Sequence, residues 1–161
     1  MREAILIVFC LFIASFWEIL ISPVIAIYGI EPNIGVMLVA FFALYRTGFA
    51  YAFFAFLWGL IIDSVSPGNM GWNSLILILI GSAISFIRNH FNWQGVSTQV
   101  AVVFLSVLVH TSVNYIIQNI DSLGNFFYFI VRFAVASALY SGIIWLLIQY
   151  LPVFRYRTRG I

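Results

Sequence analysis

The feature that most constrains this chain is one apolar stretch of 34 residues, Pro32 to Val65, PNIGVMLVAFFALYRTGFAYAFFAFLWGLIIDSV. A transmembrane helix uses about 20 apolar residues to cross a hydrocarbon core that is about 30 Å thick. One continuous helix of 34 residues would reach about 51 Å, at 1.5 Å per residue. The stretch must therefore fold back on itself, and YRTG, Tyr45 to Gly48, is the natural break.

Composition places the whole chain in a membrane, because 64% of its residues are hydrophobic and 7% are charged. A soluble domain carries roughly 25% charged residues. Runs of membrane-helix length recur along the chain, and Pro32 suits the first turn of the second helix, where a missing N–H costs nothing. The sequence predicts an all-α membrane protein, a single integral domain over residues 1–161, with helices at about 4–28, 33–45, 49–65, 72–87, 97–119 and 126–150.

The arginines test this arrangement, because cytoplasmic loops of membrane proteins are enriched in Arg and Lys. Six spans place six arginines at one face of the membrane: Arg2, Arg46, Arg88, Arg155, Arg157 and Arg159. The three opposite loops contain Glu31, Asp63 and Asp121 and no arginine. We therefore expect both termini to be cytoplasmic.

Charge and motifs argue against several functions. The net charge of +2 is small and scattered, so no nucleic-acid partner is expected. The chain has no HExxH, Walker glycine loop, Gly-x-Ser-x-Gly or CxxC motif, and its two histidines lie in different segments. We expect no enzyme activity, no cofactor and no metal site.

Four polar residues fall at membrane depth in the outer half of the predicted bundle. Glu18 lies about 15 Å and Arg132 about 9–12 Å below the outer helix ends, at 1.5 Å per residue. His110 and Asn114 share one face of the fifth helix at similar depth. An ionisable group in hydrocarbon is costly unless it pairs or reaches water, so we expect Glu18 to pair with Arg132. The cluster would act as a packing clamp, as an outward pocket for a polar ligand or a partner's side chain, or as a proton or transport path.

Small residues at four-residue spacing form a ridge on the sixth helix, Ala134, Ala138 and Gly142. Such ridges let membrane helices approach closely. The ridge would pack within the chain, or against a partner's helix or a second copy in a homodimer.

Asp63 is followed by the turn-forming residues SVSPGNMG. At an outer helix end, its carboxylate can accept hydrogen bonds from backbone N–H groups of the turn and remain hydrated. Gly71 can supply a positive φ, and Asn73 can cap or bridge. We therefore expect Asp63 to have a structural role.

The stretch from Glu31 to Leu75 resembles the bacterial rod shape-determining family MreD. That family's pattern is a proline that opens helix two, a short basic turn with glycine, then Gly-Leu-x-x-Asp and a glycine-bearing outer turn. The chain also resembles the family in length and span number. The matching positions are Pro32, Arg46, Gly48, Gly59, Asp63, Gly68 and Gly71.

The resemblance implies a non-enzymatic scaffold of the cell-elongation machinery in the bacterial inner membrane. Its partner would be MreC, a single-span periplasmic protein, with the MreB filament and the RodA and penicillin-binding-protein synthases of peptidoglycan joined through the complex. The fold would be similar to the S components of energy-coupling-factor transporters, with six helices and an outward cavity. Cytoplasmic arginines would also bind anionic membrane lipids.

Two other functions remain open. A true S component would bind a vitamin from the outer side, but such proteins tend to have an Ala-x-x-x-Ala ridge in helix one, and Ala4, Ala14 and Ala26 are not four apart. A small-molecule channel or exporter is disfavoured, because the polar residues do not line a continuous path.

Overall fold

The computed structural model describes residues 2–46, 49–65, 71–88, 90, 95–119, 124 and 126–150. These residues form six helical segments and no strand, which confirms the all-α prediction. The predicted positions Gly48, Gly68 and Asp121 and the three C-terminal arginines lie outside the described residues. The elements are α1 (Arg2–Phe16), η1 (Trp17–Ile21), α2 (Ser22–Ile25), α3 (Ile34–Tyr45), α4 (Ala50–Val65), α5 (Trp72–Arg88), α6 (Val96–Gln118), α7 (Phe126–Phe129), η3 (Ile130–Ala134) and α8 (Val135–Tyr150).

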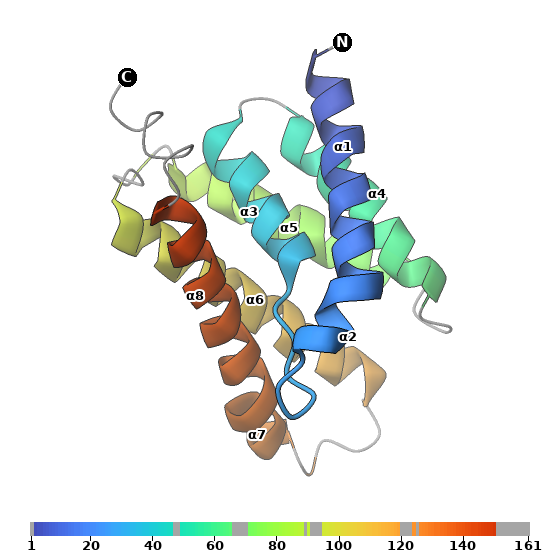
Figure 1. Ribbon diagram of the computed structural model, residues 1–161, viewed down its shortest axis with the longest axis vertical. Coiled ribbons are helices and arrows are strands. Elements are labelled where there is room, and N and C mark those ends of the chain that lie inside the picture. Colours follow the sequence, from blue (N-terminus) through green and yellow to red (C-terminus); the bar gives the residue numbers. More distant parts are fainter. Residues whose placement is uncertain are drawn as a thin grey trace.

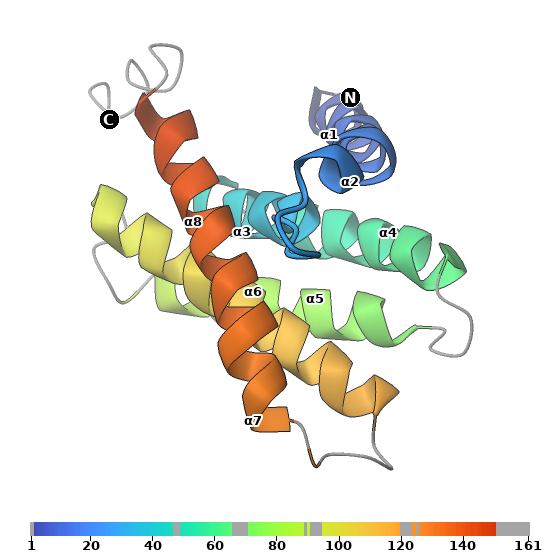
Figure 2. The same cartoon turned by 60° about the horizontal axis from the view of Figure 1, so that its bottom comes forward.

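The short helix α3 occupies the centre of the bundle. It contacts α1, α4, α5, α6 and α8, and nine of its twelve residues are buried. Figure 2 shows α3 and α4 lying between α1 on one side and α5 on the other. The start of α1 and the end of α8 lie at the same end of the bundle (Figure 1). The fold is therefore organised around a helix that is apolar on every side.

In the part of the chain that the structure describes, three helical segments are long and apolar enough to cross a membrane: Ala4–Ile25, Val96–Gln118 and Phe126–Tyr150. The other three apolar helices are shorter, Ile34–Tyr45, Ala50–Ser64 and Trp72–Arg88. Their exposed side chains include many large apolar residues, such as Phe53, Leu79 and Phe86. Such a surface suits a hydrocarbon environment rather than water.

The first helix ends earlier than the sequence predicted, at Ile25 rather than near residue 28. A π-helical turn, η1, precedes Pro23, and Ser22 N–H donates to the carbonyl of Trp17 rather than to that of Glu18. Proline lacks an N–H and its ring collides with the carbonyl four residues earlier, so the wider turn accommodates it. The chain then reverses through Tyr28 and Gly29, which both have positive φ, 53° and 77°.

Helix α3 begins at Ile34, with Asn33 as its N-cap. The Asn33 side chain accepts a hydrogen bond from Val36 N–H at 3.0 Å, which satisfies one of the free donors of the first turn. Pro32 therefore lies just before the helix, not in its first turn as predicted. It is fully buried, so it fixes the entry of the chain into the core.

Two glycines allow helices to approach more closely than any side chain would permit. A Cβ on Gly59 of α4 would lie 2.2 Å from Ser74 Cα of α5. A Cβ on Gly35 of α3 would lie 1.7 Å from Trp58 Nε1, and Trp58 is almost fully buried against it. Helices α3, α4 and α5 are thus held in a compact unit by glycine contacts.

The predicted ridge on the last helix packs inside the chain. Ala134, Ala138 and Gly142 are all buried, and a Cβ on Gly142 would meet Val100 of α6 at an ordinary 3.6 Å. Of the two interpretations given above, the structure therefore supports packing within the chain. The ridge is not exposed to a partner or to a second copy.

A polar clamp joins α3, α6 and α8 at the C-terminal end of α3. Tyr45 Oη donates to Gln99 Oε1 of α6 at 2.8 Å, and Gln149 of α8 donates to both Tyr45 and Gln99. Gln99 is 1% exposed. Sequence reasoning missed this clamp, because its members are far apart in the chain and neutral.

The Gly59 contact predicts that Gly59→Ala lowers stability, although alanine favours helices. The added methyl would collide with backbone of α5, and overpacking costs about 1–3 kcal/mol or more in the free energy of unfolding. Gly142→Ala is the matched control, because its methyl fits. Thermal unfolding in detergent, followed by circular dichroism, measures both. An unchanged melting temperature for Gly59→Ala would contradict the contact.

Candidate functional site

Asp63 of α4 binds the start of α5. Its Oδ2 accepts Gly71 N–H at 2.9 Å, and its Oδ1 accepts Asn73 N–H at 3.2 Å and the Asn73 amide at 2.9 Å. Ser74 adds longer hydrogen bonds to Oδ2 from its N–H and hydroxyl, at 3.5 and 3.4 Å. The carboxylate therefore caps the neighbouring helix, where backbone donors have no partner within the helix.

The structure confirms that Asp63 accepts backbone N–H groups, but it corrects the expectation that the carboxylate is hydrated. Asp63 is only 4% exposed, because α5 closes over it. Gly71 has a φ of 93°, a conformation that favours glycine. Gly59, one turn before Asp63, lets α5 come close enough for these bonds. The glycine and the aspartate of the Gly-Leu-x-x-Asp motif thus join α4 to α5.

The opposite end of α5 is also tied to a neighbouring helix. Arg88 Nη1 donates to the carbonyls of Ala43 at 3.1 Å and Arg46 at 2.7 Å. Both carbonyls lie at the C-terminal end of α3, where acceptors are free and a cation is favoured. Arg46 and Arg88 therefore meet at one end of the bundle, as expected if both lie in cytoplasmic loops.

A polar pocket of about 320 Å³ lies at the other end of α3. Glu18 comes from η1, Thr111 from α6, and the aromatic rings from the last helical segment. Ser22 Oγ donates to Glu31 Oε2 at 2.7 Å, which ties α2 to the turn before α3. The pocket is lined by Glu18, Glu31, Asn33, Thr111, Phe129, Phe133 and Ser137, together with the backbone turn at residues 29–32.

His110 joins the pocket wall to the core. It is 5% exposed, and its Nδ1 lies 3.4 Å from Asn33 Nδ2. Its Nε2 lies 3.1 Å from Asn114 Nδ2. Ser141 of α8 accepts Asn33 N–H at 3.0 Å. The predicted neighbours His110 and Asn114 do lie together, and Asn33, which sequence reasoning assigned no role, connects them to α3 and α8. Its position just before an apolar run is the signal for such a cap.

The structure contradicts the predicted pair of Glu18 with Arg132. Arg132 is exposed, donates to Tyr128 Oη, and stacks over the Tyr128 and Phe133 rings at 5.6 and 5.5 Å. Glu18 Oε2 is buried with no hydrogen-bond partner. The two residues share a depth, but Arg132 lies on the outer face of its helix and Glu18 faces the pocket.

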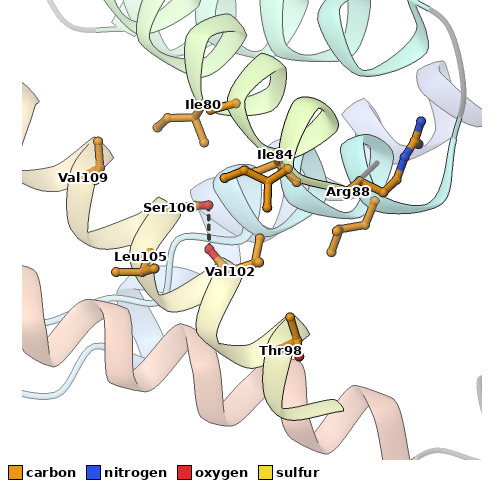
Figure 3. Close-up of a pocket in the computed structure, with 11 residues that line it drawn as sticks. Ile80, Ile84, Arg88, Thr98, Val102, Leu105, Ser106 and Val109 are labelled. Carbon is orange, nitrogen blue, oxygen red and sulfur yellow. Dashed lines mark hydrogen bonds between the residues drawn. The ribbon is translucent and has the colours of Figure 1, made fainter. Parts of the chain in front are cut away.

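A second cavity, of about 270 Å³, is an apolar groove between α5 and α6. Figure 3 shows Ile80 and Ile84 of α5 facing Val102 and Leu105 of α6, with Arg88 and Thr98 at one end. The Ser106 hydroxyl in this groove is satisfied by Val102 O at 2.7 Å. The lining of this groove is mostly apolar, and its Arg88 and Ser106 side chains already bind backbone carbonyls.

Within the described ranges, no group of three His, Cys, Asp or Glu side chains could hold a metal ion. Polar residues instead join helix ends and line one small pocket. These features define a class of protein, a helical membrane protein whose polar side chains organise its packing.

The comparisons with known proteins place the chain more closely. The family model for the rod shape-determining protein MreD matches residues 2–158, nearly the whole chain. The chain therefore belongs to the MreD family, a membrane family involved in rod shape determination and not known for enzymatic activity. No curated protein and no solved structure matches it.

The cap predicts that Asp63→Ala destabilises the bundle. The change leaves the buried Asn73 N–H unpaired and removes the acceptor of the Gly71 N–H, and a hydrogen bond to a charged group contributes about 1.5–3 kcal/mol. Ser64→Ala is the control, because Ser64 is exposed and bonds only its own helix, at Leu60 O. Thermal unfolding in detergent should show a clear loss for Asp63→Ala and little for Ser64→Ala. Equal melting temperatures would contradict the cap.

Proposed function

We propose that the chain is a non-enzymatic scaffold of the cell-elongation machinery in the bacterial inner membrane. The family match over residues 2–158 carries this proposal. An MreC-like single-span protein is the direct partner, and MreB, RodA and a penicillin-binding protein are reached through the complex. The scaffold would hold this partner where peptidoglycan synthesis is organised.

All six helical segments would cross the membrane, with both termini in the cytoplasm. The contact of Arg88 with Arg46 supports this arrangement, because it gathers two arginines at one end of the bundle. Glu31 lies in the connection before α3, and Asp63 lies in the last turn of α4; the same arrangement would place both outside. Arginines at the cytoplasmic surface would each contribute about 1 kcal/mol of attraction to anionic lipids.

The partner would bind at the outer polar pocket and along exposed apolar faces. Because the ridge of Ala134, Ala138 and Gly142 is buried within the chain, it is no longer a candidate contact. Asp63 does not line the polar pocket, so we expect it to influence partner binding only indirectly, through α4–α5 packing. The partner's membrane helix would therefore pack against one of two lipid-facing surfaces. One is the apolar groove between α5 and α6, and the other is the exposed face of α1.

The polar pocket also supports the alternative, an S component-like protein that binds a vitamin. Its volume of about 320 Å³ lies at the small end of the roughly 300–1,000 Å³ that is typical of ligand sites. Mass spectrometry of the protein purified from its native membrane separates the two functions. A stoichiometric vitamin-like molecule would favour the transporter, and its absence alongside a captured single-span protein would favour the scaffold.

The proposed topology predicts opposite labelling of two loops. In a Cys10→Ser background, Asn92→Cys should react with a membrane-impermeant maleimide only after cells are opened. Ser122→Cys should react in intact spheroplasts, because six spans place it outside. The reverse pattern, or the same pattern for both, would contradict six spans with cytoplasmic termini.

The proposed scaffold predicts capture of the MreC-like partner encoded in the same organism. Tagged protein, solubilised in mild detergent, should retain that partner through size-exclusion chromatography at a fixed ratio. An unrelated single-span protein expressed at the same level is the control. Failure of the MreC-like protein to exceed this control would overturn the proposed partner.

A further inference from the structure

The polar pocket has an excess of negative charge that the described part of the chain does not balance. Its two charged lining residues, Glu18 and Glu31, are both acids. Glu31 has a hydrogen bond from Ser22, but Glu18 Oε2 is buried and has no partner. A buried carboxylate without a donor costs several kcal/mol. Glu18 Oε2 therefore lacks a donor, and a positive charge in the pocket would supply one and would also balance Glu31.

The described arginine side chains do not provide this charge. Arg88 is bound to the end of α3, and Arg46 lies beside it at the opposite end of that helix. Arg132 is closer in the fold, but it does not line the pocket and is held by Tyr128. The missing cation would therefore come from outside these residues.

The remaining walls suit an organic cation. Phe129 and Phe133 stack one turn apart, with ring centroids 5.5 Å from each other, and both line the pocket. Aromatic faces attract ammonium and guanidinium groups, and the Arg132 guanidinium already lies over the Phe133 ring. Thr111 and Ser137 add hydroxyl oxygens that can accept N–H groups. Carboxylates, hydroxyls and aromatic rings thus converge on one small space.

We propose that the polar pocket binds an ammonium or guanidinium group, and that in the assembly this group is a basic side chain of the single-span partner. The assignment to the partner rests on the proposed function. Charge complementarity supports it, and so does size, because about 320 Å³ accommodates a side chain more readily than a large free ligand. Glu31 is exposed at the rim, so a side chain can enter from the outer surface.

The cation site is tested without any partner. The full chain in nanodiscs of phosphatidylglycerol, a lipid without a cationic headgroup, is titrated with n-butylguanidinium by calorimetry, and empty nanodiscs are subtracted. Uncharged n-butanol is the probe control. We expect saturable binding of n-butylguanidinium that is at least about tenfold weaker in Glu18→Gln, because truncating one member of a buried charge pair is costly. Glu31→Gln should weaken binding by a smaller factor, because Glu31 is exposed at the rim. Glu3→Gln, a carboxylate at the other end of the first helix, should bind as the parent does.

Several results would overturn the cation site. They are no saturable binding, equal binding of n-butanol, or unchanged binding in both glutamine variants. Because glutamine has nearly the shape of glutamate, each variant's melting temperature shows whether it is folded. A variant that fails to fold is replaced by Phe133→Leu, which removes the aromatic face and should also weaken n-butylguanidinium binding.

The source of the cation is tested by partner capture. Glu18→Gln and Glu31→Gln should retain less of the MreC-like protein than Glu3→Gln does. Alanine substitution of one basic residue beside the partner's outer membrane boundary should give the same loss, with no further loss in the double variant. Full capture by both glutamine variants would overturn the partner as the source. If the parent chain captures no partner, the proposed function fails, whereas the n-butylguanidinium titration still decides the cation site.

Discussion

The first backbone N–H groups of a helix have no partner within it, and at the start of α5 the Asp63 carboxylate binds them. This interaction needs α4 and α5 to lie almost in backbone contact, which Gly59 allows. It also needs the chain to turn at Gly71 with a positive φ. The packing of α4 against α5 rests on these three residues.

The two ends of α3 are also satisfied by side chains, an amide at one end and a guanidinium at the other. Its N-terminal end is satisfied by Asn33 and connected to α6 through His110. Its C-terminal carbonyls are satisfied by Arg88. Each end thus receives a group that matches the polarity of the helix terminus, an oxygen acceptor at the start and a cation at the end. A twelve-residue helix with few polar atoms of its own is fixed in place by its neighbours.

Much of the fold could be predicted from the sequence, because the length of apolar runs and the positions of proline, glycine and charge determine where membrane helices begin and end. The helices α3 to α6 lie within a few residues of their predicted bounds. The break at η1 was missed, since Pro23 alone does not reveal whether a helix bends, widens or stops. The predicted pairing of Glu18 with Arg132 was wrong because depth along a helix says nothing about which face a residue occupies.

Contacts between residues far apart in the chain also could not be predicted from the sequence. No local pattern indicates that Gly35 would lie against Trp58, or that Tyr45, Gln99 and Gln149 would form one hydrogen-bonded group. For Asp63, the residue type and the following turn predicted the hydrogen bonds, but burial depended on how α5 returns over α4. The sequence therefore predicted which residues belong to the Asp63 site, but not their burial or their contacts.

The length of α3 has a consequence for the membrane itself. Its twelve residues rise about 18 Å at 1.5 Å per residue, which is roughly 12 Å less than the thickness of a typical hydrocarbon core. In the proposed transmembrane arrangement, the reversed turn at residues 26–33 and the polar pocket beside it would occupy this difference at one end. The acidic side chains of the pocket would then lie below the lipid headgroups, while Glu31 stays exposed to water. A positively charged group bound there would be shielded from lipid and still held at membrane depth.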